Sequence, residues 1–164
     1  MTAPVTPARV AIAAKSLQNA DIAAIACREA GLPFFAACAL LEKESGGKNV
    51  YGHDKGGALA GFPGVVNAGN FEVFRWLVFD KGQTSNGVGP CQITFKGFFV
   101  DMESQGLKPW SPHDNMLYGF RLLKRHYDAG GSWVAAGTAY NGARSYGVDL
   151  DRKVTEWKKR LGIS

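Results

Sequence analysis

Glu44 is the residue whose surroundings in the sequence best suit acid chemistry. It ends an apolar run that starts near Pro33, and the sequence Ser-Gly-Gly follows it directly. Proline near the first turn and glycine after the last turn are typical helix boundaries, so Glu44 is predicted to lie in the last turn of a helix. The positions three, four and seven residues before it are apolar, and such surroundings raise the pKa of a carboxyl group. A carboxyl group that stays protonated can act as a general acid, although a glutamate at a helix end can also simply reach water.

The elements that would position Glu44 form a mainly helical (α+β) single domain. With 164 residues and 46% hydrophobic content, the chain can build one core but not two comfortable domains. Residues 48–64 are rich in glycine and are predicted to form turns or a short β-hairpin lobe beside the Glu44 helix. A loop is expected over residues 141–147, and a strand remains an alternative over residues 70–79. Helices are expected over residues 8–17, 22–30, 33–44, 70–79, 92–102, 114–127, 132–140 and 149–161.

Three motifs follow one another along the chain and together resemble the lysozyme-like superfamily. They are L-E-K-E-S-G-G around Glu44, N-G-V-G-P-C-Q-I-T at residues 86–94 and T-A-Y-N-G at residues 138–142. The resemblance is to lytic transglycosylases and to goose-type and phage lysozymes, which cut the glycan strands of peptidoglycan. It covers residues 40–146 and leaves the helices expected within residues 1–31 outside the recognised motifs. The sequence N-V-Y-G-H-D at residues 49–54 is most similar to the glycosidase module of endolysins from phages that infect actinobacteria.

The resemblance implies a peptidoglycan glycosidase that cleaves the MurNAc-β-1,4-GlcNAc bond with Glu44 as general acid and base. In the family, a Glu-Ser pair carries the acid, while a Gly-Leu-Met-Gln-like stretch and an Ala-Tyr-Asn stretch form the sugar groove. The matching and neighbouring positions give the candidate substrate-binding residues Ser45, Gln92, Thr94, Tyr140, Asn141 and Tyr51.

Each candidate substrate-binding residue has an expected role and a simpler alternative. The amide of Gln92 would bind N-acetyl groups or the acid, and Tyr140 would hydrogen-bond Glu44 and stack against sugar. Thr94 would hold a water molecule, and Asn141 could instead cap a turn. Tyr51, with Phe62 and Trp110 as further candidates, would supply aromatic sugar-binding surfaces, but aromatic side chains in a small domain also serve as core.

Asp54 is the candidate for a second catalytic carboxylate. It follows Glu44 by a turn-forming, glycine-rich segment that could fold it over the cleft. A carboxylate far enough from the acid to hold a water molecule would make the enzyme an inverting hydrolase. A lytic transglycosylase needs no such group, because the C6 hydroxyl of the sugar attacks C1 and leaves a 1,6-anhydro product. Asp54 could also be a turn residue that accepts hydrogen bonds from backbone amides.

Two other chemistries and one non-catalytic function remain alternatives. Cys91 precedes an expected helix and could pair with His113 or His126 as a thiol nucleophile, but its local sequence does not resemble such enzymes. The three histidines lack a metal-binding spacing, so neither a metal nor a cofactor is expected. A wall-binding module that keeps the fold without cleavage is the non-enzyme alternative.

Composition restricts the partners only weakly. Nineteen Lys and Arg residues against 14 Asp and Glu give a net charge of +5 without a basic stripe, which suits a polyanionic wall and does not indicate nucleic-acid binding. No apolar segment is long enough to span a membrane and the N-terminus does not resemble a signal peptide, so no membrane insertion is expected. We expect a monomer, and the resemblance to endolysins implies residence in the host cytoplasm until release to the wall.

Overall fold

The computed structural model describes residues 3–164 and confirms a mainly helical chain. Thr6 caps the first helix as its hydroxyl accepts a hydrogen bond from the amide of Arg9. The helices are α1 (Pro7–Ala14), α2 (Ala20–Ala30), α3 (Phe34–Glu44), α4 (Ala68–Phe79), α5 (Lys96–Ser104), α6 (Pro112–Gly130), α7 (Trp133–Asn141) and α8 (Arg144–Arg160).

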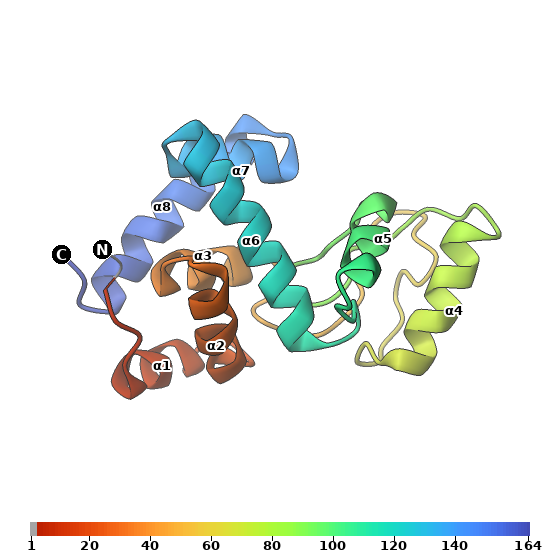
Figure 1. The fold of residues 1–164 in the computed structure, drawn as a ribbon, viewed down its shortest axis with the longest axis horizontal. Coiled ribbons are helices and arrows are strands. Elements are labelled where there is room, and N and C mark those ends of the chain that lie inside the picture. The colour runs from red at the N-terminus through yellow and green to blue at the C-terminus, as the bar shows by residue number, and fades with distance from the viewer. Residues whose placement is uncertain (1–2) are drawn as a thin grey trace.

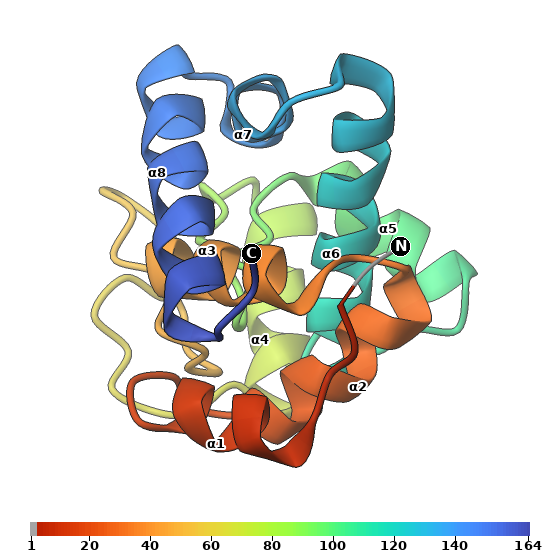
Figure 2. The same ribbon diagram turned by 90° about the vertical axis from the view of Figure 1, so that its left-hand side faces the viewer.

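Helix α6 runs through the middle of the molecule and separates two groups of elements (Figure 1). Helices α1, α2, α3 and most of α8 lie on one side, α7 lies at the upper end of α6, and α4 and α5 lie on the other side with the long connecting loops. Figure 2 shows α3 passing between α6 and α8, with α7 across one end of the group and α1 and α2 at the opposite end.

Helix α3 is enclosed on all sides, which explains its uninterrupted apolar sequence. Every residue from Phe34 to Leu41 is buried, as expected for a helix that is apolar around its whole circumference. It begins directly after Pro33 and ends at Glu44, before two glycines in the left-handed conformation. The predicted boundaries of this helix are therefore confirmed.

The glycine-rich segment does not form a regular hairpin. Within residues 3–164, β-pairing consists of four isolated bridges, Val50–Val65, Tyr51–Val88, Gly57–Thr84 and Val88–Ile93. Gly56 and Gly61 have φ of 76° and 78°, a conformation that cannot continue a strand. Asn86 takes over part of the pairing, because its side chain donates to Gly52 O and accepts from the amide of Leu59.

Two predicted boundaries near the cleft are wrong. The helix expected over residues 92–102 begins only at Lys96, because residues 88–93 close a tight turn in which Gln92 has a φ of 50°. The loop expected over residues 141–147 is mostly helical, since α8 begins at Arg144. No side chain caps α8, so the usual signal for a helix start is missing there.

Helices α7 and α8 approach closely through two glycines. A Cβ atom on Gly147 would lie 2.1 Å from Val134 O, and one on Gly137 would lie 2.8 Å from the Cα of Gly147. Neither distance is compatible with a real side chain, so both positions require glycine for this packing. The contact fixes the first turn of α8 against α7 and thereby places Tyr146, the residue before Gly147.

Candidate active site

An open cleft with a volume of about 380 Å³ lies where α3, α7, the long loops and the start of α5 meet. Glu44 contributes to its wall from the end of α3, and Asp54 does so from the glycine-rich loop. The cleft brings together six of the eight predicted site residues. Its lining consists of Glu44, Asp54, Gly87, Gln92, Ile93, Thr94, Phe95, Phe98, Leu122, Tyr140 and Asn141.

Glu44 is half-buried, and its pKa is raised above the ordinary value for glutamate. The main cause is loss of hydration, which disfavours the charged carboxylate, and the negative charge of Asp54 acts in the same direction. A hydrogen bond from Tyr146 and the positive charge of Lys43 oppose the rise. The environment expected from the apolar helix face is therefore present, and Glu44 has the properties of a general acid.

The hydroxyl that bonds Glu44 belongs to Tyr146, not to Tyr140. Tyr146 lies in the first turn of α8 and donates to Glu44 Oε1. Tyr140 instead donates to the backbone carbonyl of Cys91 at 2.9 Å, and its ring stacks on that of Tyr146 with an interplanar angle of 18°. The predicted bond from Tyr140 is thus wrong, although Tyr140 does line the cleft.

Tyr146 could have been found from the sequence. Leu150, Val154 and Trp157 are buried along one face of α8, and they follow Tyr146 at helical spacing. Extending that apolar stripe back predicts that the helix includes Tyr146, which lies two residues after its observed start at Arg144.

Asp54 lies on the exposed part of the loop and shares the cleft with Glu44. Its Oδ2 accepts a hydrogen bond of 2.8 Å from the amide of Gly87, whereas Oδ1 has no hydrogen bond within residues 3–164. The first contact fits the turn-residue interpretation. The second leaves one carboxylate oxygen available for water or substrate.

The turn that carries Gln92 is fixed by hydrogen bonds to Asn115, a fully buried residue of α6. The side chain of Asn115 accepts from the amide of Cys91 and donates to Val88 O and Pro109 O. These three bonds replace the pairing that a regular strand would provide, and they fix the position of the turn.

Gln92 lines the cleft but uses its amide group to hold the loop. Its Nε2 donates to Val50 O at 3.1 Å and to Gly89 O at 2.9 Å, which leaves Oε1 as its free polar atom. A Cβ atom on either Gly52 or Gly87 would come within 2.4 Å of that Oε1. Gln92 therefore has first of all a structural role, with one acceptor remaining for a ligand.

The other polar candidates divide into cleft residues and one helix-end residue. Thr94 and Asn141 are exposed in the cleft, and the side chain of Asn141 makes no hydrogen bond within residues 3–164. Ser45 lies outside the lining residues. Its Oγ donates to Pro90 O at 2.7 Å and accepts from the amide of Gly47, so it fastens the end of α3 to the neighbouring loop.

The most exposed aromatic side chain that lines the cleft is that of Phe95, which the sequence did not single out. The ring of Phe95 is 64% exposed and rests edge-on against Phe98, which also lines the cleft. Tyr51 is only 2% exposed, donates to Asn70 and packs against Phe74, so its prediction as a substrate-binding residue is wrong. Trp110 packs against core residue Phe71.

The thiol alternative has no support in the geometry. Cys91 is fully buried, and burial raises the pKa of its thiol well above the ordinary value, which disfavours the nucleophilic thiolate. The two ring nitrogens of His113 are engaged by Glu29 and Asp114, at 2.9 Å each. Within residues 3–164, no three His, Cys, Asp or Glu side chains form a group that could hold a metal ion.

None of the helices in residues 3–164 combines the length and the apolar character needed to cross a membrane.

No protein-family model, no curated protein and no solved structure matches this chain.

Proposed function

We propose that this protein is a peptidoglycan-degrading glycosidase with a lysozyme-like fold, which cleaves the MurNAc-β-1,4-GlcNAc bond with Glu44 as the general acid. The observation that carries the proposal is the placement of Glu44. Its carboxyl group has a raised pKa and borders an open cleft that also holds a second carboxylate. Glycoside cleavage needs a protonated carboxyl group beside the leaving oxygen, and the burial that raises the pKa of Glu44 favours that protonated form.

The lining of the cleft suits a sugar polymer. Thr94 and Asn141 offer exposed hydrogen-bonding groups, and Phe95 offers an exposed aromatic ring. Aromatic rings pack well against the apolar faces of sugars while polar neighbours bind the hydroxyl groups. The net charge of +5 favours association with an anionic wall. Together with the motif at residues 49–54, these features support a role as the catalytic domain of a phage endolysin.

In the proposed reaction, Glu44 donates its proton to the glycosidic oxygen while the C1–O bond breaks. The sugar passes through an oxocarbenium-like state, and Glu44 becomes a carboxylate. Tyr146 and Lys43 then stabilise that charge, because each lowers the pKa of Glu44. In hydrolysis, Asp54 accepts a proton from the attacking water, and the product carries an ordinary reducing end. Asp54 then releases that proton to solvent and Glu44 takes one up, which restores both groups.

Lytic transglycosylation is the second candidate, and the hydrogen bond from Gly87 to Asp54 favours it. A carboxylate oxygen that serves the backbone in this way has a sufficient structural reason to be present. In this reaction the C6 hydroxyl of the same sugar attacks C1 and gives its proton to the Glu44 carboxylate. The product is then a 1,6-anhydro sugar, one water lighter than the hydrolysis product.

Mass spectrometry of digests of purified peptidoglycan tests both the activity and its type. We expect Glu44→Gln to lose activity by at least about 100-fold, because glutamine cannot donate an acidic proton. Glu72→Gln is the matched control, since Glu72 is exposed on α4 and does not line the cleft. A Glu44→Gln variant within a few-fold of the parent would sink the proposal, and so would wall binding by the parent without release of any sugar.

A further inference from the structure

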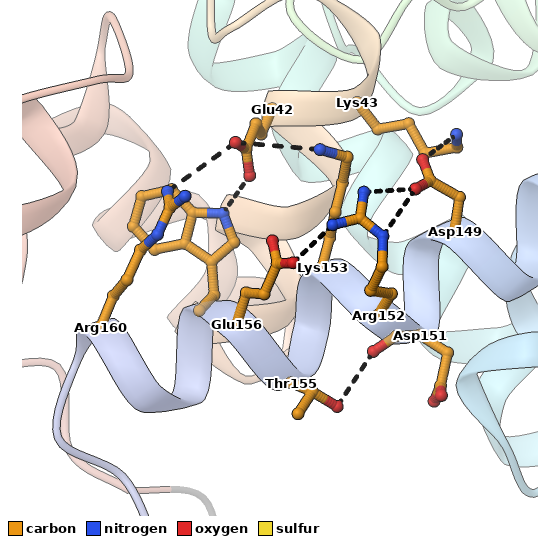
Figure 3. A network of polar contacts seen from close by, with 10 residues as sticks. Glu42, Lys43, Asp149, Asp151, Arg152, Lys153, Thr155, Glu156 and Arg160 are labelled. Carbon is orange, nitrogen blue, oxygen red and sulfur yellow. Dashed lines mark hydrogen bonds and ion pairs between the residues drawn. The ribbon is translucent and has the colours of Figure 1, made fainter.

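Three consecutive residues at the end of α3 each contact α8. Glu42 accepts a hydrogen bond of 2.7 Å from Trp157 Nε1, Lys43 pairs with Asp149 at 2.6 Å, and Glu44 accepts from Tyr146. Figure 3 shows Glu42 and Lys43 pointing from α3 onto the adjacent face of α8, where Lys43 meets Asp149. The end of α3 is therefore fastened to α8 at successive residues.

Lys43 differs from the other cations at this interface in what it touches. Its Nζ lies 4.2 Å from the centre of the Tyr146 ring, in addition to its pair with Asp149. The Lys43 side chain is only 16% exposed, so both contacts are partly shielded from water. A shielded ammonium group over an aromatic face attracts the ring more strongly than an exposed one.

Asp149 keeps the ammonium of Lys43 in that position. Its Oδ2 binds Lys43, while its Oδ1 binds Arg152 one turn further along α8 (Figure 3). Lys43 and Arg152 together lower the pKa of Asp149 to about 2, so Asp149 is charged throughout the working pH range. The charge that attracts Lys43 is therefore present throughout that range.

We propose that Lys43 is a positioning residue for the catalytic acid: anchored by Asp149, it holds the ring of Tyr146 so that the hydroxyl stays on Glu44. The groups that face Glu44 are Lys43 from α3, Tyr140 from α7, Tyr146 from α8, and Asp54 and Cys91 from the loops. Lys43 is the one cation among them, and it opposes the effect of burial on the pKa of Glu44. Removing the Lys43 ammonium group should therefore change both the orientation of the Glu44 carboxyl group and the pH at which this group ionises.

The test compares the pH profiles of wall cleavage of variants that remove the cation or its anchor. In Lys43→Met the turnover should fall roughly 3- to 30-fold as the contact with the Tyr146 ring is lost. The alkaline limb should move to higher pH, because Glu44 loses its neighbouring cation and keeps its proton longer. Asp149→Asn should also reduce turnover, but its alkaline limb should move to lower pH or stay, because an anion is removed while the cation remains.

Two further variants separate positioning from simple stabilisation of the fold. Lys43→Arg keeps the charge and the aromatic contact and should restore most of the turnover and the parent profile. Lys153→Met removes a cation that faces Glu42 at 3.8 Å between the same two helices without lining the cleft, and its profile should match that of the parent. A Lys43→Met profile that superimposes on the parent profile would overturn the proposal.

The turnover assays rest on the proposed function, because they require wall cleavage. A second measurement is independent of it. Carbon-13 NMR titration of the Glu44 carboxyl group in the intact protein reports its ionisation whether or not the wall is cleaved. We expect the midpoint to rise in Lys43→Met and to return in Lys43→Arg, in samples whose spectra confirm a folded chain. An unmoved midpoint rejects the role of Lys43, whereas full wall cleavage by Glu44→Gln rejects the proposed function alone.

Discussion

Replacing Glu44 by glutamine should stabilise the protein at alkaline pH, in the opposite direction to its effect on activity. Burial raises the pKa of Glu44 in the folded chain above its value in the unfolded chain. Between these two pKa values the folded chain binds more protons than the unfolded chain, so the free energy of unfolding falls as the pH rises. Glutamine does not titrate, and a Glu44→Gln variant avoids that loss.

The size of the effect follows from the contacts of Glu44. Each unit by which folding raises the pKa costs the parent about 1.4 kcal/mol once the pH exceeds the folded value. Glutamine keeps a carbonyl oxygen that can accept from Tyr146, but a neutral acceptor is weaker than a charged one by about 1 kcal/mol. For a chain of this size, a net gain of 1 kcal/mol raises the melting temperature by about 2–4 °C.

Differential scanning calorimetry at a series of pH values between about 4 and 9 measures this gain. The difference in melting temperature between Glu44→Gln and the parent should grow with pH and disappear at the acidic end, where both side chains are neutral. The exposed control Glu72→Gln should give no comparable growth. A difference that stays constant over the series, or that turns against glutamine at alkaline pH, would refute the argument from burial.

Two further predictions concern the cleft. If Asp54 activates water, Asp54→Asn should reduce turnover by about 100-fold, and the products of the parent should carry reducing ends. A nearly active Asp54→Asn variant, together with 1,6-anhydro products from the parent, would leave Glu44 as the one catalytic carboxylate. Phe95→Ala should raise KM for glycan strands by roughly 3- to 10-fold with little change in kcat, because the exposed ring is expected to pack on sugar in the ground state and the transition state alike. Trp76→Ala removes an aromatic side chain that is 49% exposed on α4 outside the cleft, and an equal rise in KM in that variant would count against a specific role for Phe95.

The parts of the fold that could be predicted are those that depend on local sequence. Helix α3 has a proline at its start, a continuous apolar run and glycines at its end, so its boundaries and the burial around Glu44 follow from the sequence alone. The turn before α5 does not, because Asn115 from a different helix holds Cys91 and the neighbouring carbonyls in place. A non-local bond of this kind leaves no signal in the segment that it shapes.

The helical spacing of apolar residues could place Tyr146 on α8, but it could not show which of the two tyrosines bonds Glu44. Tyr140 and Tyr146 are close in sequence and both lie near Glu44, but the hydroxyl that reaches it depends on how α8 packs on α7 through Gly147. Phe95 illustrates the same limit for apolar side chains. Phe95 is 64% exposed whereas Phe99, four residues later, is fully buried, and tertiary packing decides this difference.

The contacts that orient Glu44 join distant parts of the chain, so the site forms only when the end of α3 and α8 have come together during folding. Glu44 and Tyr146 are 102 residues apart in the chain, Lys43 and Asp149 are 106 apart, and Glu42 and Trp157 are 115 apart. Contacts of such high sequence separation carry a large loop-closure entropy and slow the folding step in which they form. A nascent or cleaved chain that lacks α8 retains the acid without the residues that orient it. The geometry around Glu44 is therefore a property of the fully folded chain, and it is lost whenever α8 detaches.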